Sequence, residues 1–188
     1  MSEFITNAAI QRLARAAGIR TMSSVNYEEV RSSIIWGLTG VLTERCIKVA
    51  EFSGSSTVNV AHVELILREV SGPAMTTQTA AKMCKIMPES KSKSVKGMKA
   101  IEEIKFTQAN SANCHMIPIA SFSSLVRSID TKSGRFRFSK EALSLMQFHV
   151  EYHTIMILKE SQLVALNAKR VGVFPKDVQI VRHIRESK

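Results

Sequence analysis

Hydrophobic residues recur at three- and four-residue steps along YEEVRSSIIWGLTGVLTERCIKVAEF, residues 27–52. This spacing places apolar side chains on one face of a long helix. Asn26 and Glu29 have the spacing of a capping box, so we expect the helix to begin there. The residues expected on its apolar face are Val30, Ile34, Leu38, Val41, Val49 and Phe52.

Shorter amphipathic segments flank this helix. One covers about residues 5–17 and stops at Gly18, a residue typical of helix ends, and another follows TVNV with Asn59 as its N-cap. The second half repeats the order with a helix near Ser121 to Ile129, an extended RFRF, a long helix from Ser139 to about Asn167, and a helix opened by Pro175. The apolar face of its long helix contains Leu143, Met146, Val150, Ile157 and Val164. The chain therefore looks like two weakly similar copies of one short-long-short motif.

The stretch between the copies, SGPAMTTQTAAKMCKIMPESKSKSVK, has a Gly-Pro break and no sustained periodicity. It contains many lysines and one acid, which is typical of a loose tether. After it, KAIEEIKF regains helical character from Met98 to about Gln108. We expect an all-α chain with one fold over residues 1–70, a basic flexible linker over 71–97, and a second fold over 98–188.

The charge balance narrows the class of partner. Lys and Arg outnumber Asp and Glu by 26 to 16, for a net charge of +10, so a polyanion is the first partner to consider and an anionic membrane the second. No apolar run approaches the roughly 20 residues of a membrane span, and the start lacks the features of a signal peptide. These features predict a soluble intracellular protein that is not secreted and has no membrane partner.

Little in the sequence favours catalysis, a cofactor or a metal. HVE occurs at residues 62–64 and 149–151 and is half of a zinc-deaminase signature, but the PCxxC half is missing. His149 and His153 lie one helical turn apart without a visible third ligand. No P-loop or GxGxxG is present, and the three cysteines, which form no CxxC, are Cys46, Cys84 and Cys114. We therefore expect no enzyme, no cofactor and no metal site.

Specific stretches carry a family resemblance. NAKRVGVFPKDVQ, residues 167–179, closely resembles the last loop and helix of core histone three, and KAIEEIKF is similar to that histone's extra N-terminal helix. ITNAAIQRLARAAGIR followed by VNYEEVR resembles core histone four. Over residues 5–70 and 98–186, the chain is similar to the fused histone doublets of giant viruses of the marseillevirus type, in the order four-then-three. The resemblance implies two tandem histone folds that form an intramolecular handshake pseudo-heterodimer.

In that family the loops of the two partners pair. VGVF is then expected beside residues near Ile19 to Met22, and RFRF beside Thr57 and Val58. Each paired loop would bring basic residues to successive phosphates across a DNA minor groove, with Arg137 at the position of a minor-groove arginine. The DNA-binding residues implied by the resemblance are Arg12, Arg15, Arg20, Arg127, Arg135, Arg137, Lys169, Arg170 and Lys176.

The chain also departs from the family pattern. Thr21 stands where the first copy has a minor-groove arginine, SGSS at 53–56 replaces a basic loop, and Glu102 replaces an arginine. We expect weaker DNA binding at these places, partly offset by the lysine-rich linker. Almost nothing precedes Ile5, so the long basic tail of histone four is expected to be absent.

The resemblance further implies assembly. The second copy would self-associate through a four-helix bundle of Val164, Asn167, Arg170, Asp177 and Ile180, with Asn167 in place of a histidine and an Arg170–Asp177 ion pair. The outer surface of the first copy would meet a second doublet, similar to histones two B and two A, through Lys48, Glu51, Leu65 and Glu69.

The expected function is structural: the protein would wrap and compact viral DNA in nucleosome-like chromatin particles, in the virion, a viral factory or the host nucleus. The alternative is a histone-fold heterodimer module of a transcription or chromatin-associated complex. Basic residues on helices are also commonly just a solvated surface.

Overall fold

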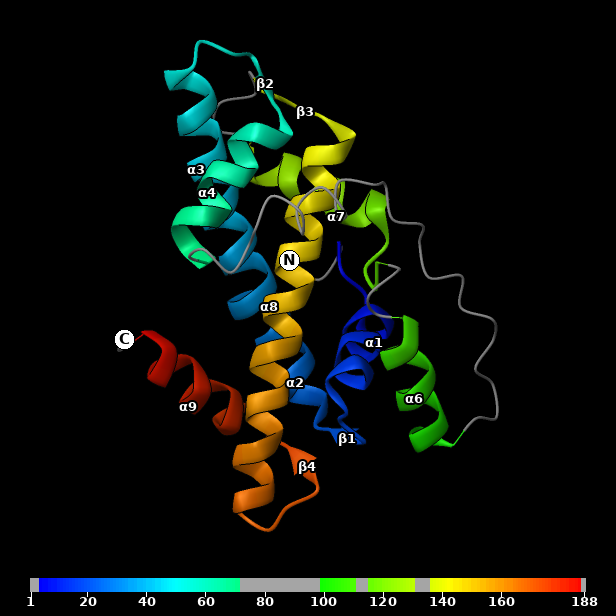
Figure 1. Ribbon diagram of the computed structural model, residues 1–188. Coiled ribbons are helices and arrows are strands. Elements are labelled where there is room, and N and C mark those ends of the chain that lie inside the picture. Colours follow the sequence, from blue (N-terminus) through cyan, green and yellow to red (C-terminus); the bar gives the residue numbers. More distant parts are fainter. Residues whose placement is uncertain (1–3, 72–98, 111–114, 131–135, 187–188) are drawn as a thin grey trace.

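The computed structural model describes residues 4–71, 99–110, 115–130 and 136–186 (Figure 1). Over these ranges the regular structure consists of helices and four two-residue strands, joined by short loops. Arg135, Cys84, Cys114 and the predicted linker from residue 72 onward lie outside the described residues.

The N-terminal half contains a short, a long and a short helix, as predicted. Thr6 caps the first helix by accepting a hydrogen bond from the Ala9 amide, and Gly18 ends it with a φ of +93°, a conformation that favours glycine. The last helix begins directly after Asn59. The elements are α1 (Asn7–Ala17), β1 (Thr21–Met22), α2 (Ser24–Glu29), the π-helix η1 (Val30–Trp36), α3 (Gly37–Phe52), β2 (Thr57–Val58) and α4 (Val60–Ser71).

The C-terminal half repeats this order after an accessory helix. Ser139 caps the long helix by accepting from the Ala142 amide, and Pro175 opens the last helix, as predicted. The elements are α6 (Ala100–Asn110), α7 (Ile119–Ile129), β3 (Arg137–Phe138), α8 (Lys140–Asn167), β4 (Gly172–Val173) and α9 (Pro175–Glu186).

Each short strand of one half pairs with a strand of the other half. In the parallel pair β1·β4, Thr21 lies opposite Gly172, and in the parallel pair β2·β3, Thr57 lies opposite Arg137. The expected pairing of VGVF and of RFRF is therefore confirmed. Figure 1 shows the two strand pairs at opposite ends of α8.

One predicted cap is wrong and has another role. Asn26 does not begin the long helix, because α2 starts earlier, after Ser23. Its side chain is buried and its Nδ2 donates to the Val173 carbonyl at 2.5 Å. Asn26 thus fastens the long helix of the first half to β4 of the second.

The π-helical segment η1 moves the buried face of the long helix. In a π-helix each amide bonds to the carbonyl five residues earlier, so the segment holds one more residue than the α-helix it replaces. The predicted apolar face is buried at Val30 and Ile34, but Val41 and Phe52, which follow η1, are 53% and 97% exposed. Three buried positions after η1, Thr39, Leu42 and Ala50, each follow a predicted one by one residue, and Thr43 and Cys46 are buried as well.

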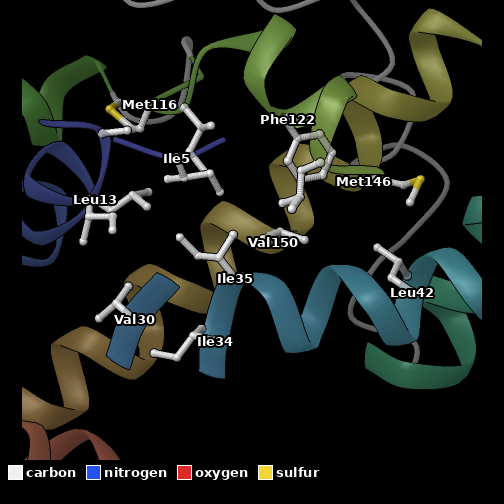
Figure 2. Packing of buried hydrophobic residues seen from close by; sticks show 14 of the residues in the cluster. Ile5, Leu13, Val30, Ile34, Ile35, Leu42, Met116, Phe122, Met146 and Val150 are labelled. Carbon is white, nitrogen blue, oxygen red and sulfur yellow. The ribbon is translucent and has the colours of Figure 1, made fainter. Parts of the chain in front are cut away.

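A single hydrophobic cluster contains side chains from both halves. Figure 2 shows Ile35 of the first half facing Val150 of α8, with Phe122 of α7 and Leu13 of α1 on either side. All four are buried. Because each half supplies only part of this cluster, neither half has a closed core of its own.

A buried carboxylate holds the chain that leads into α7. Glu151 of α8 accepts hydrogen bonds from the Met116 and Ile117 amides, at 3.0 and 2.9 Å, and from Gln147 Nε2 at 2.9 Å. The glutamate of the second HVE motif is therefore structural in this fold.

We expect Glu151→Ala to lower the free energy of unfolding by about 3 kcal/mol, because each buried amide left without an acceptor costs about 1–3 kcal/mol. Glu151→Gln keeps one acceptor oxygen and should lose less. Urea unfolding followed by the fluorescence of Trp36, the one tryptophan of the chain, measures both. Wild-type stability in the alanine variant would contradict this role.

The buried His149 and the half-buried His153 form a second polar feature of α8. Their ring centroids lie 4.3 Å apart, and His149 Nε2 is buried without a hydrogen-bond partner among the described residues. Burial, and secondarily the neighbouring His153 ring, lowers the pKa of His149 to about 4. Burial and then the charge of Arg185 also lower the pKa of His153.

These shifts predict an acid-sensitive fold. Above pH 6.5 His149 is neutral in both states, but between about pH 6.5 and 4 the unfolded chain binds a proton that the folded chain does not. The free energy of unfolding should therefore fall by about 1.4 kcal/mol per pH unit over that interval for this group alone. Urea unfolding at several pH values should give a flatter profile for His149→Gln, whereas the exposed His183→Gln should keep the wild-type slope.

Candidate nucleic-acid interface

Basic side chains gather at the β1·β4 end of the molecule. Arg20 precedes β1, Lys169 and Arg170 precede β4, and Lys176 lies in the first turn of α9; all but the half-buried Arg170 are exposed. The strand register Thr21↔Gly172 brings the residues of the two halves side by side. This end therefore combines cations from both halves.

Lys169 occupies a strained backbone position at this end. Its φ is +55°, in the left-handed region that glycine usually fills after a helix. The turn is stabilised by hydrogen bonds from the Lys169 amide to the Leu166 carbonyl and from the Arg170 amide to the Ala165 carbonyl. A lysine at a position that favours glycine is consistent with a requirement for its charge.

Arg170 is held in place by two contacts. Its guanidinium donates two hydrogen bonds to the Asp177 carboxylate, at 2.7 and 3.0 Å, and lies 5.0 Å from the centre of the Phe174 ring. Burial disfavours the charged carboxylate, but hydrogen bonds from Arg170 and the Phe174 amide outweigh it, so the pKa of Asp177 is lowered. The expected Arg170–Asp177 ion pair is present, and it offsets much of the arginine's charge.

Arg15 is likewise engaged within the protein. Its Nε donates to Glu103 of α6 at 2.7 Å, and its Nη1 donates to the carbonyls of Ile19 and Arg20. Gln108 adds a bond from α6 to the Ala16 carbonyl. Arg15 therefore fixes the turn between α1 and β1 and docks α6 on α1.

The β2·β3 end carries a smaller basic cluster. Arg137 is exposed on β3, and Lys140 is exposed in the first turn of α8. The adjoining loop SGSS contains no cation, and its Ser55 hydroxyl donates to the Thr57 carbonyl at 2.8 Å. The cations at this end thus come from the C-terminal half.

The two ends are joined by the length of α8. Its 28 residues span about 42 Å at roughly 1.5 Å per residue. Arg127 is exposed in the last turn of α7, and Arg12 is half-buried in α1 with its Nε donating to the Ala8 carbonyl. In Figure 1, α1 and α7 lie on one side of α8 and α4 and α9 on the other.

Two residues of these ends were not predicted as site residues. Lys140 follows RFRF and its capping serine directly, and this position next to a basic extended segment is a usable signal. Phe174 is 47% exposed beside Arg170 and Lys176. The exposure of Phe174 could have been predicted from strand alternation, because successive side chains point to opposite sides and the preceding Val173 is fully buried.

Apolar side chains are exposed on the outer surfaces of both halves. Of the residues predicted for assembly, Ile180 and Leu65 are 47% and 57% exposed. Val164 is half-buried, Arg170 and Asp177 form the pair described above, and Asn167, Lys48, Glu51 and Glu69 are exposed. Further exposed apolar residues on the same helices are Leu163, Ile184, Val41 and Phe52.

Other kinds of site find no support in the described part of the chain. There, no helix has both the length and the apolar character to cross a membrane. Nor do three metal-ligating side chains converge anywhere among the described residues. Cys46 is buried, and burial raises the pKa of its thiol to about 12, so it is unreactive.

Comparison with known proteins agrees with this architecture. Residues 96–184 match the core histone domain family, whose description covers histones two A, two B, three and four. The crystal structure of the histone from Methanopyrus kandleri is similar with a TM-score of 0.58 and 16% sequence identity, over 94% of this chain and 92% of that chain. The structural match therefore includes the N-terminal half, which the family match does not reach. Residues 96–184 thus match the core histone domain family, and the described residues have the histone fold.

Proposed function

We propose that this chain is a structural DNA-binding protein that compacts DNA in nucleosome-like particles. In this proposal it is a tandem histone doublet: residues 1–70 are a histone-four-like fold, 98–188 a histone-three-like fold with its accessory helix, and 71–97 the tether. The observation that carries the proposal is the β1·β4 end, where strand pairing between the halves brings the exposed Arg20, which precedes β1, to the same end of the molecule as the exposed Lys169 and Lys176.

DNA would be held through its phosphates and minor groove rather than its base edges. Exposed cations lie near both ends of α8, whose length of about 42 Å somewhat exceeds one helical turn of DNA, roughly 34–36 Å. In the proposal, a duplex that runs along the molecule contacts both ends. In the proposed interface Arg20, Arg137, Lys169 and Lys176 contact DNA directly, together with Arg12, Arg127 and Arg135. Arg15 and Arg170 contribute mainly by positioning the two loops, since carboxylates hold their guanidinium groups.

The fusion would make pairing of the two folds obligatory. A short tether raises the effective concentration of one half around the other to about the millimolar range. The exposed apolar residues support further assembly: Ile180 and its neighbours on α8 and α9 through a second copy, and Leu65 with Lys48, Glu51 and Glu69 through a partner doublet. In this proposal the DNA is viral, as in the giant-virus doublets that the sequence resembles, and the protein acts in the virion, a viral factory or the host nucleus.

A charge-matched pair of double variants tests the proposed interface. Arg20→Gln/Lys169→Gln removes two cations from the β1·β4 end, and Arg68→Gln/Lys159→Gln removes two exposed cations from elsewhere. Binding to a short duplex, measured by fluorescence anisotropy between about 50 and 200 mM salt, should weaken at least tenfold only for the first. Its log–log salt slope should also be shallower by about 1.8, at about 0.9 per lost phosphate contact.

Equal weakening by both double variants would mean that net charge alone drives binding. That outcome would overturn the assignment of the interface to the strand-pair ends. Thermal unfolding of both variants checks that the fold is intact.

Micrococcal nuclease digestion of the protein bound to long DNA tests compaction. We expect a discrete protected fragment on the order of half the roughly 147 bp of a nucleosome, with two chains bound. Such a fragment requires curved DNA held at successive contacts by a pair of chains. Smeared protection with one chain per complex would instead favour a histone-fold module of a transcription complex.

A further inference from the structure

A hollow lies beside Phe174 at the β1·β4 end of the molecule. It is lined by Arg170, Phe174, Pro175, Lys176 and Gln179 and has a volume of about 520 Å³. It therefore joins an aromatic ring, an exposed lysine and an exposed amide in one concave surface. Phosphate contacts of a duplex need a cation but not an aromatic ring, so the interface proposed above leaves the ring unexplained.

Strand alternation and the start of α9 place the ring on the surface. Val173 of β4 points into the core and is fully buried, so Phe174 points the opposite way and is 47% exposed. The Phe174 amide donates to Asp177 Oδ2 at 2.9 Å, which fixes its backbone at the first turn of α9. The exposed ring is thus held by its backbone rather than left on a loose loop.

The Arg170–Asp177 pair makes this surface rigid. Two hydrogen bonds orient the guanidinium, which lies 5.0 Å from the ring centroid. Asp177 is itself buried, with its side chain 2% exposed, so the ion pair is anchored in the fold. The ring is already in place before any ligand arrives, so little ordering cost opposes a planar ligand that stacks on it.

We propose that this hollow binds an unpaired base of a single-stranded nucleic acid, stacked on Phe174, with Lys176 at the adjoining phosphate. An aromatic ring within a basic groove is the arrangement by which proteins hold single strands, because every base has a face that stacks. Gln179 offers both a donor and an acceptor to a base edge. A base within a duplex is already stacked on its neighbours and cannot occupy the hollow.

The proposal deepens the proposed function, because it rests on the same end as the phosphate contacts. It adds a selectivity that phosphate neutralisation does not provide. At equal charge, a flexible single strand should gain from Phe174, whereas an intact duplex should not. Sites where DNA is locally unpaired would then be held more tightly than the surrounding duplex.

The test compares a single strand of thymidines with a blunt duplex of equal length in binding to the full chain, by fluorescence anisotropy at one salt concentration. Phe174→Leu keeps an apolar side chain but removes the aromatic face, and Phe174→Tyr keeps the face. Phe106→Leu is the matched control: Phe106 is a 37% exposed phenylalanine of α6, which lies across α8 from α9 in Figure 1. Thermal unfolding verifies that each variant folds.

We expect Phe174→Leu to weaken single-strand binding at least fivefold and duplex binding less than twofold, with Phe174→Tyr and Phe106→Leu close to wild type. Photocrosslinking of a 5-iodouracil strand should also label the peptide that contains Phe174. Unchanged single-strand binding in Phe174→Leu, or an equal loss for both ligands, overturns the proposal while the duplex interface stands. Conversely, a wild-type chain that binds single strands through Phe174 but does not bind duplex supports the site and removes the proposed function.

Discussion

The structure depends on contacts between its two halves, because each half needs the other to pair its strands and to complete its hydrophobic core. A two-residue strand satisfies few backbone groups and has no stability of its own, and each strand here finds its partner only in the other half. The hydrophobic cluster is divided in the same way, with Ile35 from one half against Val150 from the other. Asn26 adds a side-chain bond across the divide to Val173. The basic surface is a product of this constraint, because pairing the strands is what juxtaposes the cations.

Local signals in the sequence predicted the helices well, since the features that end or begin a helix act within one turn. Gly18, Ser139 and Pro175 are examples. The Asn26–Glu29 spacing led to a wrong prediction of where the long helix begins, because residues three apart also lie on the same face inside a helix. The buried face beyond η1 could not be predicted from a regular 3.6-residue period, because the π turn adds one residue and so shifts every later position around the helix. The strand pairs came from the family resemblance, because two residues carry too little pattern to identify a strand.

Contacts between distant residues decide what the basic residues do. Arg15 and Arg20 look alike in sequence, yet Arg15 meets Glu103, 88 positions away, while Arg20 remains exposed. Arg170 and Lys169 are adjacent, and only the arginine meets a buried carboxylate. The sequence thus locates the basic regions. It does not tell which cations are held by carboxylates within the protein and which remain exposed. The assignment of individual residues to DNA remains a prediction.

The β1·β4 pairing has a consequence for how the protein is made. Thr21 must wait for Gly172, which is 151 positions later in the chain (172 minus 21). At roughly 5–20 residues per second of synthesis, this interval is roughly 8–30 s, during which β1 has no strand to pair with. The β1·β4 pair therefore forms only near the end of synthesis or after it, and a nascent chain cut short before residue 172 lacks this pair.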